Sequence, residues 1–258
     1  MGTVKGASLK PQIRIGTSGW NYNHWAGLFY IDCPKARWLE CYTRTFSTVE
    51  VNATFYHLPK PGTVENWRIR TPEKFLWSVK ASRYITHMKK LRDPEESLQR
   101  FYDVVENFGE KLGPILLQLP PSLVYREDVL DEFWAHVRKG HRYTIEPRNA
   151  SWLEDLALEK LRSLNIALCI AQTAGRFPFR EAVTADFVYV RLHGSQALYG
   201  SDYTEEELQE WAKKIRKWKR DTYVYFDNDA NAYAPKNAKR LKEILKIKDM
   251  QGRPAAAL

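Results

Sequence analysis

Charged side chains recur in this sequence at the ends of short apolar, β-branched stretches. Within the stretch 47–59, Glu50 and Asn52 point to the opposite face from their valine neighbours, because side chains alternate along a strand. Lys80 and Glu146 end two further apolar stretches in the same way. Two carboxyl groups can act as an acid–base pair when burial keeps one neutral and a cation keeps the other ionised. We therefore take Glu50, Glu146 and Lys80 as candidate catalytic residues. The alternative for Glu50 is a structural carboxylate paired with Lys80 or Arg191, since opposite charges at strand ends neutralise each other.

Lys80 offers a second kind of chemistry. In a site that excludes water, a lysine amine has a lowered pKa and can form a Schiff base with a carbonyl compound. Lysine and arginine side chains also hold anions, and arginine does so through two parallel hydrogen bonds. Polar residues at the other strand ends complete the site. The candidate ligand-binding residues are Thr17, Ser18, Asn52, Gln118, Arg148, Arg191, His193 and Asn228.

Eight short strands, most of them separated by helical stretches, must position these residues. We predict strands at 13–16, within 47–59, and at 75–80, 113–119, 142–146, 166–170, 186–192 and 222–226. We predict helices at 36–43, 63–70, 95–108, 128–138, 151–164, 204–219 and 234–245. Ser151 is expected to begin the 151–164 helix as its N-cap, with Glu154 completing a capping box.

This order of elements predicts an α/β fold, a single (β/α)8 TIM-type barrel over residues 13–246. We expect a flexible N-terminus at 1–12 and a loose C-terminal tail at 247–258. The interval between the third and fourth strands has room for an extra helix or lid. The C-terminal strand ends of such a barrel meet at one mouth, so the candidate residues are expected to lie together there.

Composition restricts the class of protein. The chain has 258 residues, of which 44% are hydrophobic, and about 250 residues suit one (β/α)8 domain. Its three cysteines form no C-x-x-C pair, which favours a reduced, cytoplasmic protein with structural thiols. No segment approaches the ~18 consecutive apolar residues of a membrane span, and no signal-peptide core is present near Met1. We expect no membrane partner, and the sequence leaves the oligomeric state open.

The sequence also bears on cofactors. No Gly-rich dinucleotide loop follows the first strand, so a nucleotide-dependent redox enzyme is not expected. Divalent metals require clusters of histidine and carboxylates, whereas Lys80, Arg148 and Arg191 would repel a cation. No H-x-x-E or H-x-H spacing occurs. We therefore expect a metal-independent enzyme of hydrolase or lyase type, its cofactor unknown, acting on a small anionic ligand at the barrel mouth.

The alternative is a protein that binds or processes nucleic acid. The net charge is +9, and the rings of Trp20, Tyr22, Trp25 and Tyr30 could stack on bases. Much of the positive charge lies at 211–220, where the spacing of apolar residues also fits an ordinary helix with a solvated basic face. Nucleic-acid binding through phosphate contacts would weaken strongly with added salt.

Ordered motifs along nearly the whole chain resemble the YecE-like family, also known as domain of unknown function 72. They are Gly16-Thr-Ser-Gly-Trp20, Glu50-Val-Asn52, Lys80-Ala-Ser-Arg83, Gln118-Leu-Pro-Pro-Ser122, Glu146-Pro-Arg148, Tyr189-Val-Arg-Leu-His-Gly194 and Val224-Tyr-Phe-Asp-Asn-Asp229. The resemblance implies a (β/α)8 barrel shaped like metal-dependent sugar isomerases and an apurinic endonuclease, with no established activity. Asp227 and Asn149 depart from the family pattern, so neither is expected to carry a mechanism.

Overall fold

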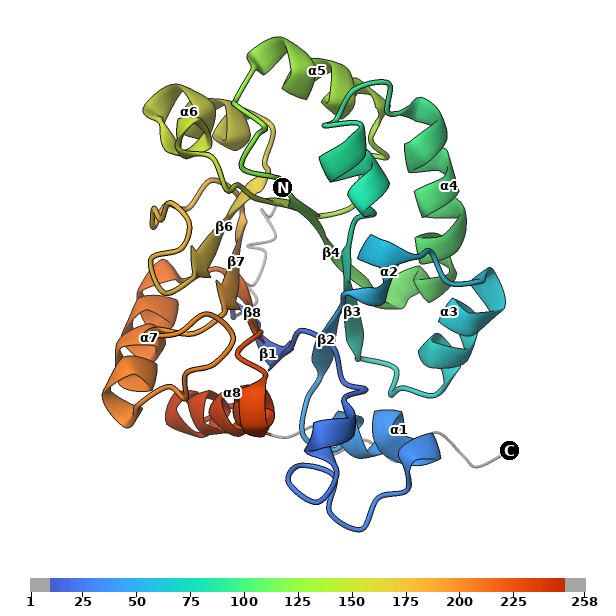
Figure 1. Ribbon diagram of the computed structural model, residues 1–258, viewed down its shortest axis with the longest axis vertical. Helices are drawn as coiled ribbons and strands as arrows, with labels where there is room; N and C mark the ends of the chain where they lie inside the picture. Colours follow the sequence, from blue (N-terminus) through green and yellow to red (C-terminus); the bar gives the residue numbers. More distant parts are fainter. Residues whose placement is uncertain (1–9, 249–258) are drawn as a thin grey trace, which may run out of the picture.

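The computed structural model describes residues 10–248, and in this range eight parallel strands form the inner layer of the molecule (Figure 1). The strands are β1 (Ile13–Thr17), β2 (Thr48–Val51), β3 (Leu76–Lys80), β4 (Leu112–Gln118), β5 (Tyr143–Glu146), β6 (Ala167–Gln172), β7 (Phe187–Leu192) and β8 (Asp221–Phe226). Their hydrogen-bonded order is β1-β8-β7-β6-β5-β4-β3-β2. A bridge between Ser18 and Glu50 joins β1 to β2. The predicted single barrel is therefore confirmed.

Helices form a ring around this barrel (Figure 1). They are α1 (Trp38–Thr43), α2 (Ala53–Tyr56), α3 (Pro61–Ile69), α4 (Glu95–Val105), α5 (Glu127–His136), α6 (Asp155–Ser163), α7 (Glu205–Trp218) and α8 (Tyr233–Leu245). Short helical turns are η1 (Asn23–Trp25), η2 (Lys35–Arg37), η3 (Tyr84–Met88), η4 (Glu106–Lys111), η5 (Ala150–Leu153) and η6 (Ala230–Ala232). The π-helical turn η3 lies in the long β3–β4 interval, where an extra helix was expected. The expected end segments 1–12 and 247–258 fall largely outside the described residues.

The start of α6 corrects the predicted capping box at Ser151. Asn149 caps the short turn η5, because its Oδ1 accepts a hydrogen bond from the Ser151 backbone N–H at 3.1 Å, and Ser151 lies inside that turn. The extended backbone of Glu154 separates this turn from α6. A capping box does occur at α7, where the Thr204 hydroxyl and the Glu207 carboxylate each accept from the other's backbone N–H.

Tyrosine rings fill the inside of the barrel below the strand ends. Tyr189 and Tyr225 are fully buried, together with the apolar side chains of β4, β6 and β7. The Tyr189 hydroxyl lies 2.7 Å from the Ser78 hydroxyl, and that of Tyr225 lies 2.7 Å from the Thr48 hydroxyl, so both buried hydroxyls have partners. Gly16 allows β1 to approach β2 closely, since a Cβ there would lie 2.2 Å from the Thr48 carbonyl oxygen.

The cysteines differ from expectation. Cys33 and Cys41 form a disulfide between α1 and the loop before it, with Cα atoms 6.7 Å apart, whereas Cys169 is free and buried. The indole of Trp38 donates a hydrogen bond to the Cys33 carbonyl at 3.1 Å and holds this loop against α1. The prediction of three reduced thiols was therefore wrong. The fold places Cys33 beside Cys41, although their spacing in the sequence matches no known disulfide or metal motif. A cytoplasmic location loses its support from the cysteines.

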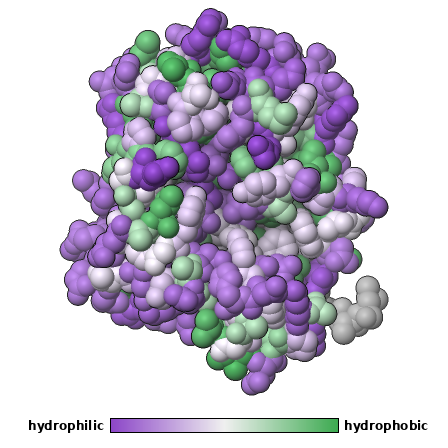
Figure 2. All heavy atoms as spheres, in the orientation of Figure 1, coloured by the Kyte–Doolittle hydropathy of each residue, from purple (hydrophilic) through white to green (hydrophobic). Residues whose placement is uncertain are grey.

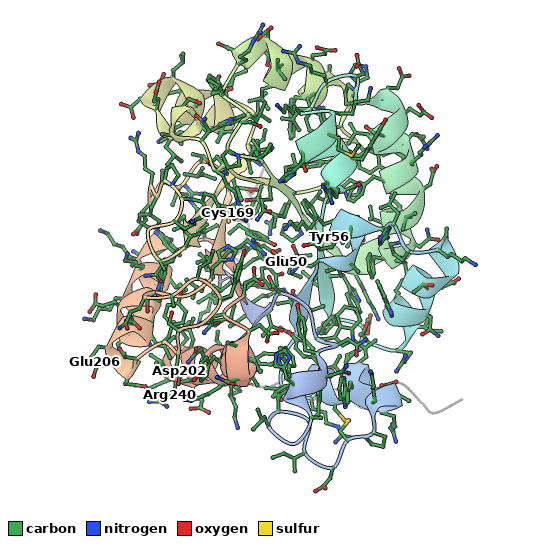
Figure 3. All side chains as sticks on the ribbon, in the orientation of Figure 1. Glu50, Tyr56, Cys169, Asp202, Glu206 and Arg240 are labelled. Carbon is green, nitrogen blue, oxygen red and sulfur yellow. A yellow bond between two sulfur atoms is a disulfide. The ribbon has the colours of Figure 1, made fainter. Side chains whose placement is uncertain are left out.

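The outer surface is mostly hydrophilic on the face shown in Figure 2. On α7 and α8, several basic residues pair with acids: Lys214 with Glu181 at 2.7 Å, Arg240 with Glu205 at 2.7 Å and Lys236 with Asp202 at 2.5 Å. Figure 3 shows Asp202 and Arg240 at the periphery of the molecule. These pairs fit a solvated helix face. Within residues 10–248, no helix combines the length and the apolar character required to cross a membrane.

Candidate functional site

Most of the predicted site residues converge on the barrel mouth, meaning the C-terminal ends of the strands and the loops that follow them. Alternation along the strands turns Glu50, Lys80, Gln118, Glu146 and Arg191 toward the barrel axis, and all five are buried. Figure 3 shows Glu50 near the centre of the ring of helices. Side chains from β2, β3, β4, β5 and β7 thus meet, although they are far apart in the sequence.

Arg191 lies at the centre of this group. Its guanidinium donates hydrogen bonds to Glu50 at 2.8 Å, to Glu146 at 2.7 Å and to Asp227 at 3.0 Å. His193 Nδ1 lies 2.9 Å from Asp227 Oδ2, and its Nε2 lies 3.4 Å from Glu146 Oε1. We call these five residues the Arg191 cluster. It was not expected that one cation would hold three carboxylates.

Both carboxylate oxygens of Glu50 already accept hydrogen bonds from neighbouring side chains. Arg191 Nε and Nη2 both donate to its carboxylate, the Tyr189 hydroxyl donates at 2.6 Å, and the Ser18 hydroxyl forms a further short hydrogen bond. The carboxylate is also completely buried. These donors hold the carboxylate in one orientation beside the guanidinium. Glu50 therefore fixes the position of Arg191.

Glu146 is held in a similar way. Gln118 donates to its Oε1 at 3.0 Å, and Arg191 donates to its Oε2. Burial raises the pKa of Glu146, but Arg191 and His193 outweigh this effect and hold it well below its ordinary value. Burial also raises the pKa of Asp227, and again Arg191 and His193 lower it overall. Both carboxyl groups are therefore ionised at neutral pH.

His193 lies between two carboxylates of the cluster. Burial and Arg191 lower the pKa of its imidazole, but the contacts with Asp227 and Glu146 outweigh them and raise the pKa above its ordinary value. Lys80 is the neighbouring cation that interacts with the carboxylates of the cluster.

Lys80 has an unusual environment for a lysine. Only 7% of the residue is exposed, and its Nζ lies over the ring of Phe55, 4.0 Å from the centroid. No oxygen among residues 10–248 forms a hydrogen bond or ion pair with Nζ. Burial, with a further contribution from Arg191, lowers the pKa of Lys80 to about 8 despite the attraction of Glu146, Glu50 and Asp227. A substantial fraction of the amine is therefore neutral near pH 8.

Arg148 is the second cation of the mouth without a carboxylate partner in the described part of the chain. Its guanidinium lies over Phe177, 4.3 Å from the ring centroid, and its buried Nε has no hydrogen-bond partner. Other buried polar atoms of the mouth loops also lack hydrogen-bond partners in this range, among them Asn52 Oδ1, Ser195 Oγ and Asn228 Oδ1. Buried polar groups are rarely left unpaired, so these atoms mark a place where a ligand or water binds.

His87 was missed by the sequence analysis as a site residue. It lies on η3, with its ring edge-on to Phe55 at 5.0 Å, and its Nδ1 is 2.9 Å from the Thr86 hydroxyl. Burial, Lys80 and Arg148 lower the pKa of His87 to about 4, so the imidazole is neutral at pH 7. Asp227 was set aside because it departs from the family pattern, yet it belongs to the Arg191 cluster. Its place directly after β8 was the available signal.

Two predicted ligand-binding residues have structural contacts instead. The Thr17 hydroxyl donates to the Gly19 carbonyl at 2.6 Å and lies 2.9 Å from the Tyr42 hydroxyl, so Thr17 faces α1 and not the mouth. Asn228 Nδ2 donates to the Ser201 carbonyl at 2.9 Å and to Asn237 at 2.8 Å. This amide ties the loop after β7 to α8, and only its Oδ1 remains without a partner.

Two of the four candidate stacking rings in the loop after β1 are packed inside the protein. Trp25 is 0% exposed and Tyr30 is 4% exposed. Trp20 packs edge-on against Trp67 and Trp77 with centroids 5.1 and 5.2 Å away, and the Tyr22 hydroxyl donates to the Ser18 carbonyl. Trp25 and Tyr30 are therefore not accessible for stacking on bases, whereas Trp20 and Tyr22 are partly exposed.

The mouth contains carboxylate and histidine side chains, which are ligands that a divalent metal uses, but these side chains surround the Arg191 guanidinium. Within residues 10–248, no group of three or more histidine, cysteine, aspartate or glutamate side chains is arranged to hold a metal ion. The carboxylates of Glu50, Glu146 and Asp227 point to Arg191 instead. The Arg191 cluster is therefore arranged as a network of ion pairs.

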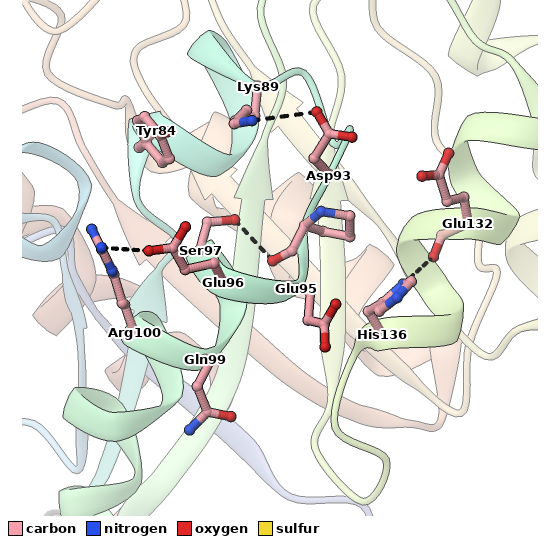
Figure 4. Close-up of a pocket in the computed structure, with 11 residues that line it drawn as sticks. Tyr84, Lys89, Asp93, Glu95, Glu96, Ser97, Gln99, Arg100, Glu132 and His136 are labelled. Atoms are coloured by element: carbon pink, nitrogen blue, oxygen red, sulfur yellow. Dashed lines mark hydrogen bonds and ion pairs between the residues drawn. The ribbon is translucent and has the colours of Figure 1, made fainter.

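A separate hollow of about 710 Å³ lies on the flank of the barrel between η3, α4 and α5 (Figure 4). In its lining Lys89 pairs with Asp93 at 3.3 Å and Arg100 with Glu96 at 2.5 Å. None of its lining residues carries a buried polar atom without a partner. We therefore assign the candidate site to the mouth and not to this hollow.

Relatives in two bacteria match nearly the whole chain. UPF0759 protein YunF of Bacillus subtilis (strain 168) is 24% identical, over 91% of this chain and 95% of that protein. UPF0759 protein YecE of Escherichia coli (strain K12) is 26% identical, over 91% of this chain and 93% of that protein. Neither name states an activity.

Solved structures agree with the fold. A DUF72 family protein from Thermotoga maritima MSB8 has a TM-score of 0.82 and 26% identity, covering 91% of this chain and 99% of that one. One from Enterococcus faecalis V583 has a TM-score of 0.81 and 20% identity, covering 92% and 96%. The family model described as "Protein of unknown function DUF72" matches residues 14–257. The YecE-like resemblance is thereby confirmed, and this chain belongs to the DUF72 family.

Proposed function

We propose that this protein is an acid–base enzyme, of lyase or hydrolase type, that binds a small anionic ligand at the barrel mouth. The observation that carries the proposal is a pair of cations, Lys80 and Arg148, that lie in the mouth without a carboxylate partner among the described residues. Cations inside proteins are normally paired, so an unpaired couple marks the place of an anion supplied by a ligand.

Arg148 is suited to hold that anion. Its face rests on Phe177, which fixes the plane of the guanidinium, and Nε is buried and available as a donor. A planar guanidinium matches a carboxylate or phosphate through two hydrogen bonds. Asn52 Oδ1 is available to accept a hydrogen bond from a hydroxyl group of the same ligand. Arg191 is not available for this role, because its donors are already used by the cluster.

Lys80 is the group best placed to transfer a proton. Its pKa of about 8 lies near neutral pH, where an acid–base catalyst is most effective. His87, on the same ring of Phe55, has a pKa lowered to about 4 and is neutral at pH 7, so it is not the base in this proposal. In this proposal Glu50 and Glu146 do not form the acid–base pair that their sequence positions suggest; they hold Arg191 in place and supply the negative field.

The nucleic-acid alternative depends on the net charge of +9 and on the partly exposed rings of Trp20 and Tyr22. Trp25 and Tyr30 are buried, and basic residues of α7 and α8 are paired with acids. An oligonucleotide is therefore included as one arm of the experiment below, at low salt, where phosphate contacts are strongest.

A thermal-shift measurement tests the proposal with inorganic phosphate, pyruvate, dihydroxyacetone phosphate and an oligothymidylate. A small anion at a hundred times its dissociation constant adds about 2.7 kcal/mol to the free energy of unfolding, which raises Tm by about 5–10 °C. We expect such a shift for at least one small anion and none for the oligonucleotide. Arg148→Met should abolish the shift, because it removes the anion-binding group.

The matched control is Arg220→Met, which removes an exposed arginine and should keep the full shift. A shift of equal size in Arg148→Met and wild type would contradict the assignment of the anion to Arg148. Stabilisation by the oligonucleotide alone would move the function to the basic surface.

A further inference from the structure

We infer that the ligand of this site is an aldehyde or ketone that also carries an anionic group, and that its carbonyl carbon bonds to Lys80 Nζ as an imine. This inference rests on the proposed function above and narrows its substrate class. It depends on where Nζ lies, on what Nζ does not contact, and on the groups that surround it.

The surroundings of Nζ are those of a nucleophile. A lysine that only neutralises acids forms ion pairs, as Lys160 does with Glu127 at 2.9 Å and Asp131 at 2.7 Å. Lys80 Nζ instead faces the ring of Phe55, and no oxygen among residues 10–248 engages it. When such an amine loses its proton, its lone pair is not occupied by a hydrogen bond. It can then attack a carbonyl carbon.

Several charged groups influence this amine. Arg191 disfavours its protonation, whereas Glu146, Glu50 and Asp227 favour it, and burial exceeds all of them. His87 is the titratable group on η3 that interacts with Lys80. Because the cluster carboxylates are held by Arg191 and His193, none of them pairs with the amine and keeps it charged.

The chemical step balances without a cofactor. The neutral Lys80 amine adds to the carbonyl carbon and gives a carbinolamine, as one N–H proton passes to the oxygen. Loss of that oxygen as water, with the second N–H proton, forms the C=N double bond. No electron is gained or lost. The protonated imine then withdraws electrons from the neighbouring carbon, which permits C–H or C–C bond cleavage of the lyase type.

Arg148 sets the requirement for an anion. It lies in the same mouth as Lys80, and both lower the pKa of His87. A carbonyl compound with a carboxylate or phosphate can therefore pair with Arg148 while its carbonyl group meets Nζ. An uncharged carbonyl compound of the same shape lacks that contact and should react less.

Reductive trapping tests the inference with two matched pairs of probes. Pyruvate is compared with acetone, and dihydroxyacetone phosphate with dihydroxyacetone, each with cyanoborohydride, followed by peptide mass spectrometry. We expect a reduced adduct on Lys80 with at least one anionic probe, formed at least about tenfold faster than with its uncharged partner. Loss of one charge-assisted hydrogen bond accounts for a factor of this size.

Variants separate the outcomes. Lys80→Arg keeps the charge and should give no adduct, Arg148→Met should lower the rate with the anionic probe about tenfold, and the surface control Lys217→Met should label as wild type does. Circular dichroism confirms that each variant is folded. Labelling of Lys80 that is no faster than labelling of Lys217 overturns the inference. If phosphate still raises Tm while no probe labels Lys80, only the imine fails; if no anion raises Tm, the proposed function fails as well.

Discussion

Replacing Arg191 with methionine is expected to lower the free energy of unfolding by about 3–5 kcal/mol at pH 7. The change leaves Glu50, Glu146 and Asp227 buried close together without the cation that holds them. Removing one partner of a buried ion-pair network costs this much because the remaining charges stay desolvated. Urea unfolding followed by circular dichroism measures the loss, and Arg220→Met, at an exposed arginine, should change stability little.

The pH dependence gives this prediction a second test. In wild type the pKa values of Glu146 and Asp227 are lowered, so their stabilisation is present above the unfolded pKa near 4 and is lost as pH falls below it. Without Arg191 the same groups have raised pKa values and bind protons more readily when folded. The deficit of Arg191→Met should therefore shrink as pH falls from 7 to 4. A deficit below about 1 kcal/mol at pH 7 would show that the cluster is not a buried network.

Replacing Lys80 with methionine is expected to have the opposite effect and to stabilise the protein by ~3 kcal/mol at pH 7. The folded protein lowers the pKa of Lys80 from 10.5 to about 8, and each tenfold change in acidity corresponds to about 1.4 kcal/mol. Methionine fills a similar volume over Phe55 without a charge to desolvate. A buried residue that lowers the stability of the folded protein is typically kept for its function. Ligand binding or activity should be lost in the same variant.

The stability gain should disappear at high pH. Between about pH 8 and 10.5 the unfolded chain binds a proton at Lys80 and the folded chain does not, so wild-type stability rises with pH in this window. The difference between Lys80→Met and wild type should therefore approach zero near pH 10.5. Unfolding curves at pH 7, 8.5 and 10 measure it, with Lys217→Met as the exposed control. If Lys80→Met is less stable than wild type at pH 7, the lysine has a structural role.

The barrel could be predicted from the sequence because strand spacing and alternation are local properties. Eight apolar stretches with intervening helices specify the fold, and alternation correctly turns Glu50 and Lys80 inward. Alternation also excludes that Thr17 and Ser18 both reach the mouth, because consecutive residues of a strand face opposite sides. Ser18 does, through its hydrogen bond with Glu50, and Thr17 does not.

The charge state of the site could not be predicted, because it is set by contacts across the barrel. Glu50 and Arg191 are 141 residues apart in the chain, and only the closed barrel brings them into contact. The sequence suggested Glu50 as an acid and Arg191 as an anion binder, with a structural pair of Glu50 with Lys80 or Arg191 as the alternative. In the structure Glu50 pairs with Arg191. The same reason applies to Trp25, whose burial depends on Asp229 and the loop after β8.

The measurement that tests the site most directly is the pKa of Lys80 in the folded protein. The ¹³Cε resonance of Lys80 in ¹³C-lysine-labelled protein, assigned by its absence from the Lys80→Met spectrum, is followed from pH 6 to 11. A midpoint near 8, with surface lysines near 10.4, is the expected result and supports a reactive amine in the mouth. A midpoint near 10.4 for Lys80 would contradict it, because the amine would then stay charged at neutral pH and could serve neither as a base nor as a nucleophile.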